Sequence, residues 1–169
     1  MSQSIEARAA FDTLKLETFA WLGLGIAVAS YATALISQYG FGWEPCELCL
    51  WQRYPYVLGA ALGGAGLFWS AGPRRALFAA AAAVFLAGAG LAFYHTLVEF
   101  GVLEGLASCG GATISDAATF EDFKAETEGV TPIVCGSRTP FLFGLTMTNW
   151  NLLVSLDIAF LFGFAALRR

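Results

Sequence analysis

The residues with the clearest chemical potential are four cysteines, which fall into two pairs along the chain. Cys46 and Cys49 form a C-x-x-C in the stretch PCELCLWQRYPY, and Cys109 and Cys135 bracket a later polar stretch. Thiolates are the nucleophiles of disulfide exchange, and an even number of thiols in an oxidising compartment predicts disulfides. The two pairs therefore indicate either structural disulfides or sites of thiol–disulfide exchange.

The surroundings of the C-x-x-C favour a reactive pair. If Cys49 begins the helix that follows, unpaired N–H groups and the partial positive charge of a helix N-terminus stabilise its thiolate. Arg53 lies four residues further on and can reach the same helix face. Glu47, between the cysteines, opposes a thiolate by charge repulsion. On balance we expect the thiolate on Cys49.

Three other interpretations of the cysteines are chemically possible. Four thiolates can bind zinc, but the second pair lacks the short spacing of zinc knuckles, so we predict no metal site. Two purely structural disulfides also satisfy the cysteine count, although a membrane bundle needs them less than a small secreted domain does. Free core thiols are the third interpretation, and they fit an oxidising compartment least.

Two basic side chains are predicted at a depth similar to that of the C-x-x-C. Arg53 begins the second apolar run, and His95, the only histidine, lies near the end of the third. Taken alone, His95 can be a packing residue, and Arg53 can extend its charge to the lipid headgroups. Two donors at one depth beside a thiol pair instead favour a bound polar ligand contacted by both.

Asp157 directly follows the last charge-free run and lies near the middle of the expected span 147–167, deeper than the thiols. An acid at that depth is a functional candidate by default. Because of its distance from the cysteines, we expect instead a neutral carboxyl that is hydrogen-bonded to Ser30, Thr33 or another helix.

Long apolar runs must position these residues. Of 169 residues, 57% are hydrophobic and 13% charged, and the mean hydropathy of +0.64 is typical of a membrane protein. Four runs are free of charge and each can supply the about 20 residues of a bilayer-spanning helix: 18–43, 54–73, 76–98 and 139–156. We expect an all-α membrane protein, a four-transmembrane-helix bundle forming one membrane domain over residues 1–169.

The boundaries of this bundle follow from the runs and the turn signals between them. The expected spans are 18–37, 50–70, 76–98 and 147–167, and the expected outward loops are 38–49 and 99–146. The first run follows a stretch of mixed charge and is longer than the about 7–15 apolar residues of a signal peptide. We therefore expect it to be a retained helix.

The distribution of charge predicts which side of the membrane the cysteines face. Four spans put both termini on one side, and the basic residues gather there: Arg8, Lys15, Arg74, Arg75, Arg168 and Arg169. An excess of Lys and Arg marks the cytoplasmic face, so the termini are predicted to be cytoplasmic and both cysteine loops to face outward. The net charge of −4 argues against a nucleic-acid partner.

One further element is predicted inside the loop 99–146. The stretch SDAATFEDFKAETE, between Cys109 and Cys135, can form a short helix with Phe120 and Phe123 on one face. We expect this helix to lie on the membrane surface with its two rings dipped inward. A disulfide that closes this loop would be accessible and loosely held, which suits exchange.

Along nearly its whole length the chain resembles the DsbB family of inner-membrane disulfide-forming proteins. The resemblance covers four spans, a C-x-x-C in the first outer loop and a cysteine pair that brackets the second. It also covers the arginine in CELCLWQR, the histidine in FYHTLVE and the approach to the last span in FLFGLTMTNWNLLVSL.

The resemblance implies a protein-dithiol:quinone oxidoreductase in the bacterial inner membrane, with both cysteine loops in the periplasm. Under this assignment a periplasmic DsbA-like thiol oxidase attacks Cys109, whose companion is Cys135. Electrons then pass by exchange to the pair Cys46–Cys49, and from Cys49 to a membrane quinone.

The resemblance also implies that Arg53 and His95 hold or polarise the quinone ring. A DsbA-like partner is already a strong oxidant, so its reoxidation requires an acceptor outside the thiol pool. A quinone that takes up two electrons and two protons meets that requirement. The sequence does not distinguish ubiquinone from menaquinone, or a general partner from a dedicated one.

Two alternative functions remain. A vitamin K epoxide reductase-like oxidoreductase uses the same logic, but in that family the loop pair precedes the C-x-x-C, whereas here Cys46 and Cys49 come first. A membrane subunit with stabilising disulfides and no catalytic activity is the other alternative.

Overall fold

The computed structural model describes residues 2–69, 73–106, 109, 135–138 and 140–167, with side chains from residue 17 onward. The surface helix predicted between Cys109 and Cys135 lies outside these residues. The described elements, in chain order, are α1 (Ser2–Phe41), α2 (Glu47–Trp51), α3 (Arg53–Phe68), α4 (Arg74–Glu99), β1 (Pro140–Leu142), β2 (Leu145–Thr146) and α6 (Met147–Leu167).

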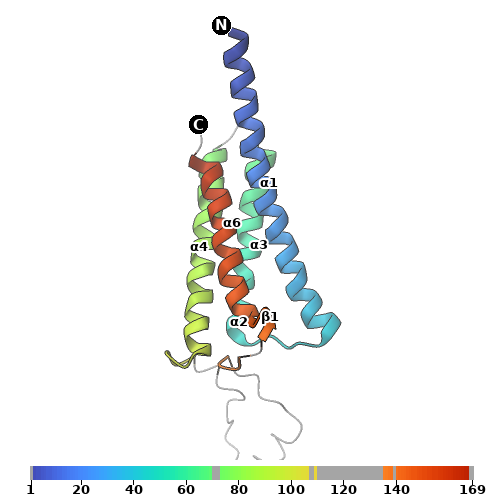
Figure 1. The fold of residues 1–169 in the computed structure, drawn as a ribbon, viewed down its shortest axis with the longest axis vertical. Coiled ribbons are helices and arrows are strands. Elements are labelled where there is room, and N and C mark those ends of the chain that lie inside the picture. Colours follow the sequence, from blue (N-terminus) through green and yellow to red (C-terminus); the bar gives the residue numbers. More distant parts are fainter. Residues whose placement is uncertain (1, 70–72, 107–108, 110–134, 139, 168–169) are drawn as a thin grey trace, which may run out of the picture.

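The four longer helices lie side by side as a bundle (Figure 1). Helix α4 packs against α3 and α6, and α1 packs against α3 and α6 as well. Both chain termini lie at one end of the bundle, with α1 extending beyond it, and α2 and β1 lie at the other end (Figure 1). The cysteines of the C-x-x-C, at and within α2, are therefore far from the termini.

Within the described residues, three helices are long and apolar enough to cross a membrane: Glu17–Phe41 of α1, α4 and α6. They overlap the predicted spans 18–37, 76–98 and 147–167. The chain is accordingly an all-α membrane protein in its main architecture.

The predicted span 50–70 is not one helix. Helix α2 ends at Trp51 and α3 begins at Arg53, with Gln52 between them. Pro55 explains the break, because it has no N–H to donate to the Trp51 carbonyl and the helical hydrogen bonds cannot run through this point. Helix α3 has 16 residues, fewer than the about 20 needed to cross the hydrocarbon, so a fourth span stays a prediction.

Stacked aromatic rings form the core of the bundle. Phe78 and Phe85 of α4 and Phe162 of α6 are fully buried. The ring of Phe162 stacks on the other two, with centroid distances of 6.0 Å and 6.1 Å. Helix α3 meets these rings with glycines, at each of which a Cβ would overlap a phenylalanine ring: Gly59, Gly63 and Gly66. Small residues of this kind let membrane helices pack closely.

A β-hairpin within the predicted loop 99–146 was not anticipated. Strands β1 and β2 are antiparallel and are joined by Phe143 and Gly144, which have φ angles of 53° and 76°. Two successive positive φ angles are the geometry of a two-residue type I′ turn. The hairpin leads Thr146 back to the end of α4, where its hydroxyl donates to Glu99 Oε2 at 2.8 Å.

Substitution of Gly63 tests this core. In Gly63→Ala the new methyl group overlaps the buried ring of Phe162, and overpacking of this kind costs about 1–3 kcal/mol. Its neighbour provides a matched control, because a Cβ at Gly64 meets nothing within 4 Å. Thermal unfolding in detergent should show a lower midpoint for Gly63→Ala and no loss for Gly64→Ala. Equal midpoints would contradict the packing described here.

Candidate active site

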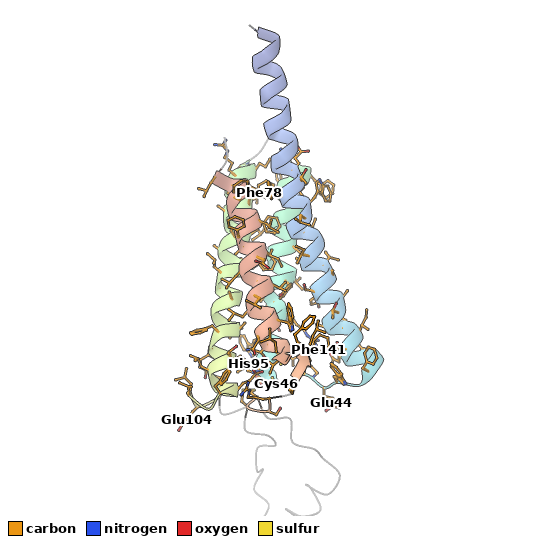
Figure 2. All side chains as sticks on the ribbon, in the orientation of Figure 1. Glu44, Cys46, Phe78, His95, Glu104 and Phe141 are labelled. Atoms are coloured by element: carbon orange, nitrogen blue, oxygen red, sulfur yellow. A yellow bond between two sulfur atoms is a disulfide. The ribbon has the colours of Figure 1, made fainter. Side chains whose placement is uncertain are left out.

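The two cysteine pairs meet at the end of the bundle opposite the termini. Figure 2 shows Cys46 and His95 close together there, where α4 ends and α6 begins. Cys46 belongs to the same buried cluster as Cys109 and Cys135. Pairs that are far apart in the sequence therefore share one site.

The second pair is closed. Cys109 and Cys135 form a disulfide with their Cα atoms 5.0 Å apart, and they are only 3% and 2% exposed. The expectation of an accessible disulfide is therefore wrong for this state, because the pair packs against Val98 and Cys46. The disulfide also excludes a zinc site built from all four thiolates.

The first pair is open, and its geometry differs from the prediction. The sulfur atoms of Cys46 and Cys49 are 2.8 Å apart. Helix α2 begins at Glu47, so Cys46 is its N-cap, and Cys46 Sγ accepts the backbone N–H of Cys49 at 3.4 Å. The prediction that Cys49 begins the helix and carries the thiolate is wrong, because the N–H groups at the start of α2 stabilise charge on Cys46.

The proton affinities of the two sulfurs follow this geometry. The hydrogen bond with Cys49 is the main cause that lowers the pKa of Cys46 to about 5. Burial acts against it, and the hydrogen bond with His95 acts in the same direction as that with Cys49. The hydrogen bond to Cys46, burial and the charge of Cys46 all raise the pKa of Cys49. The pair therefore holds one negative charge at neutral pH, on Cys46.

His95 contacts both cysteine pairs. Its Nε2 lies 3.7 Å from Cys46 Sγ and 3.1 Å from the backbone carbonyl oxygen of Cys135. Its Nδ1 faces away from the sulfurs, 2.7 Å from the side-chain nitrogen of Gln52 and 3.3 Å from the hydroxyl of Thr148. The ring is 2% exposed, and these four groups are its hydrogen-bond contacts among the described residues.

The contacts of the ring bear on metal binding. Cys46, Cys49 and His95 carry potential ligand atoms within 4.8 Å of one another. Because the amide of Gln52 donates to Nδ1, the proton of the neutral ring lies on Nε2, the nitrogen that faces Cys46. A nitrogen that carries a proton cannot bind a metal, so this arrangement favours an N–H···S hydrogen bond.

Arg53 and His95 were predicted to contact one ligand together, but they belong to different hydrogen-bond networks. The Arg53 guanidinium donates to Gln38 Oε1 at 2.6 Å, which joins the start of α3 to the last turn of α1. His95 contacts Cys46, the Cys135 carbonyl, Gln52 and Thr148 instead. Arg53 retains further N–H donors for a ligand.

Asp157 also differs from expectation. Its side chain is exposed on the outside of α6, and no hydrogen bond to it occurs within the described part of the chain. The Thr33 hydroxyl donates to the Ala29 carbonyl of its own helix at 2.9 Å. The predicted hydrogen bond from Asp157 to Ser30 or Thr33 is therefore wrong.

Several polar residues of the site were missed from the sequence. Gln52, Glu99 and Thr148 are buried beside the cysteines, and Asn151 is partly buried on the next turn of α6. Each is a polar residue in or at the end of a long apolar run. A buried polar group in a membrane span is a functional candidate, so this signal was present in the sequence.

Titration of the reduced C-x-x-C tests the assignment of the charge. In a Cys109→Ala/Cys135→Ala background only Cys46 and Cys49 can ionise as thiols. We expect one thiolate per protein, present at neutral pH and lost as the pH falls through about 5. The ultraviolet absorption of the thiolate measures this transition. Adding Cys46→Ser should abolish the transition near pH 5. If the transition instead remained with Cys46→Ser and disappeared with Cys49→Ser, the charge would lie on Cys49.

The comparisons with known proteins agree with these features. The family model of the disulfide bond formation protein DsbB matches residues 17–165. The disulfide bond formation protein B of Xylella fastidiosa is 31% identical over 147 residues, covering 82% of this chain and 84% of the relative. That of Burkholderia pseudomallei is 32% identical over 140 residues, covering 79% of each chain.

A more distant relative is an uncharacterized protein of Rickettsia prowazekii, 24% identical over 139 residues, with 82% of this chain and 80% of the relative covered. No solved structure gives a significant match. The family match spans both halves of the site, from the C-x-x-C to the last helix. The chain belongs to the DsbB family of membrane disulfide bond formation proteins, which are oxidoreductases of disulfide formation.

Proposed function

We propose that this protein reoxidises a periplasmic DsbA-like thiol oxidase and passes the electrons through its two cysteine pairs to a membrane quinone. The observation that carries the proposal is the position of His95 Nε2 between Cys46 Sγ and the Cys135 carbonyl. One buried group thereby contacts both pairs, which places them beside each other. The family supports the disulfide chemistry.

The exchange steps can be assigned to individual sulfurs. A thiolate of the reduced partner attacks Cys109, the Cys109–Cys135 bond breaks, and Cys135 leaves as a thiolate. Cys135 attacks Cys46 of the closed first pair, and Cys49 leaves with a proton. The second thiol of the partner attacks the mixed disulfide and releases Cys109, and the partner leaves oxidised. Cys109 then attacks Cys135, re-forms their disulfide and releases Cys46 as a thiolate.

This sequence ends with Cys109–Cys135 closed and the first pair reduced, which is the pattern of bonds in the structure. The two electrons of the partner then reside on Cys46 and Cys49. The Nε2–H of His95 stabilises the negative charge that the last step leaves on Cys46. Formation of the Cys46–Cys49 bond releases the two electrons and one proton from the pair.

The residues at this end of the bundle suit a quinone. When bound, a quinone supplies an acceptor for two electrons and two protons. Arg53 offers charged N–H donors suited to a carbonyl oxygen and is only partly buried. Cys49 is more exposed than Cys46 and is the sulfur from which we expect the electrons to leave. His95 is enclosed by protein groups, so its role is to contact the sulfur atoms, and any contact between His95 and the quinone is secondary.

The orientation of the chain is part of the proposal. We place the termini in the cytoplasm and the cysteine end in the periplasm of a bacterial inner membrane. The support is the excess of basic residues at the end of the bundle that carries the termini, among them Arg74, which pairs with Glu17 at 3.0 Å. The water-soluble partner and the lipid-soluble acceptor can both reach a site at this outer boundary.

Reconstitution with a reduced DsbA-like partner and added quinone tests the function. Wild-type protein should consume quinone, and the loss of the ultraviolet absorption of quinone measures this consumption. Cys49→Ser should reduce the rate by a factor of about 100 or more, because the pair can no longer close. No quinone loss with the wild-type protein and a cognate partner would refute the proposed function.

The quinone contact is tested by Arg53→Met. Loss of a charged hydrogen bond should raise the KM for quinone about tenfold with little change in the KM for the partner. Arg75→Met is the matched control, because Arg75 is exposed at the end that carries the termini. An unchanged KM for quinone in Arg53→Met would remove Arg53 from the quinone site.

A further inference from the structure

Four side chains beyond the sulfurs form a continuous hydrogen-bonded chain that ends on His95. The Tyr56 hydroxyl donates to Asn151 Oδ1 at 2.6 Å, and the Ser155 hydroxyl lies 3.2 Å from the same oxygen. Asn151 Nδ2 donates to Gln52 Oε1. Gln52 Nε2 then donates to His95 Nδ1 at 2.7 Å. The chain crosses from α3 to α6 and back before it reaches α4.

The direction of the donors decides which nitrogen of His95 carries the proton. An amide has an acceptor at one end and donors at the other. In the structure Asn151 Oδ1 accepts from two hydroxyls and the Asn151 nitrogen donates to Gln52 Oε1, so the other end of the Gln52 amide, its nitrogen, faces the ring. Nδ1 accepts, and the ring proton lies on Nε2.

We propose that Gln52 and Asn151 are positioning residues that hold His95 with its Nε2–H directed at Cys46 Sγ and the Cys135 carbonyl. This inference rests on the proposed function for its consequence, which is transfer between the two cysteine pairs. Without the donor on Nδ1 the ring can carry its proton there, because the Thr148 hydroxyl 3.3 Å away can accept it. The lone pair of Nε2 would then face the sulfur.

Burial makes this arrangement specific. Gln52 is 5% exposed and His95 is 2% exposed, so water does not replace a lost partner at low cost. Gln52 also occupies the junction of two helices, as the C-cap of α2 and the N-cap of α3. From this position its side-chain amide contacts both Asn151 and His95.

The other charged groups near the site are held by partners of their own. Glu99 of α4 accepts from the Thr146 hydroxyl at 2.8 Å, and Arg53 donates to Gln38. Glu47 of α2 is exposed and accepts from the indole of Trp51 at 3.3 Å. Glu99 acts on both Cys49 and His95 through its charge, so it is left unchanged in the test.

The test compares Gln52→Met with Gln52→Glu, using the titration of Cys46 in the Cys109→Ala/Cys135→Ala background. Methionine has a similar length but gives Nδ1 no donor, so the titration of Cys46 should move up by about one pH unit. Glutamate accepts from Nδ1–H and favours a ring with protons on both nitrogens, so the titration should stay in place or move down. Asn151→Leu leaves Gln52 Oε1 unpaired and should move the titration up by less than Gln52→Met does.

Two controls separate positioning from general damage. Thr33→Val removes a hydroxyl that donates to the Ala29 carbonyl of its own helix, and it should leave the titration unchanged. In a His95→Phe background Gln52→Met should cause no further shift, because its effect acts through the ring. A merely structural role would lower the unfolding temperature of both Gln52 variants without moving the titration in different directions.

The outcomes distinguish this inference from the proposed function. Equal shifts of the Cys46 titration in Gln52→Met and Gln52→Glu would overturn the positioning role. So would a Cys46 titration that moves neither in Gln52→Met nor in Asn151→Leu. The titration needs neither partner nor quinone, so it reads the hydrogen-bonded chain even if the reconstitution fails. With intact cysteines, electron transfer between the two cysteine pairs should slow about tenfold in Gln52→Met. If the wild-type protein consumes no quinone, only the proposed function is refuted.

Discussion

One nitrogen atom, Nε2 of His95, contacts both cysteine pairs of this protein. It lies 3.7 Å from Cys46 Sγ and 3.1 Å from the Cys135 carbonyl oxygen. A buried thiolate requires hydrogen-bond donors to offset the loss of water. The site supplies them from this ring, from the Cys49 thiol and from the backbone N–H of Cys49. Charge is consequently stabilised on Cys46, which shares a buried cluster with Cys109 and Cys135.

The rest of the bundle keeps that nitrogen in place. Phenylalanines stack between α4 and α6, and glycines bring α3 against them, so the helices that carry the polar groups have fixed positions. The interruption at Gln52 then turns one amide toward His95. The hairpin before α6 also helps to fix the end of α4, because it brings the Thr146 hydroxyl to Glu99.

Much of the fold was predictable because the apolar runs of a membrane protein are long and free of charge. The segments 76–98 and 147–167 lie within α4 and α6, and the four cysteines, which were expected on one side of the bundle, lie together at one end. The break between α2 and α3 could also have been predicted from Pro55, which has no backbone N–H. The continuous apolar run around Pro55 instead suggested one helix. The hairpin depends on a positive φ at Phe143, which few non-glycine residues adopt.

The roles within the site were harder to predict than its members. A helix that begins at Cys49 favoured the thiolate on Cys49, but α2 begins two residues earlier, at Glu47, and its start stabilises charge on Cys46 instead. Depth alone grouped Arg53 with His95, yet the rotation of each helix directs Arg53 to Gln38 and His95 to the sulfurs. The hydrogen-bonded chain behind His95 joins residues of three helices, and no local pattern indicates which of them meet.

The most direct test of the account is the bond that forms between the pairs. In Cys49→Ser/Cys109→Ser the only thiols are Cys46 and Cys135, and mild oxidation followed by mass spectrometry should find them joined in nearly all molecules. In Cys46→Ser/Cys135→Ser the remaining Cys49 and Cys109 should stay largely unpaired. Ready pairing of Cys49 with Cys109, and none of Cys46 with Cys135, would contradict transfer through the contact that His95 makes.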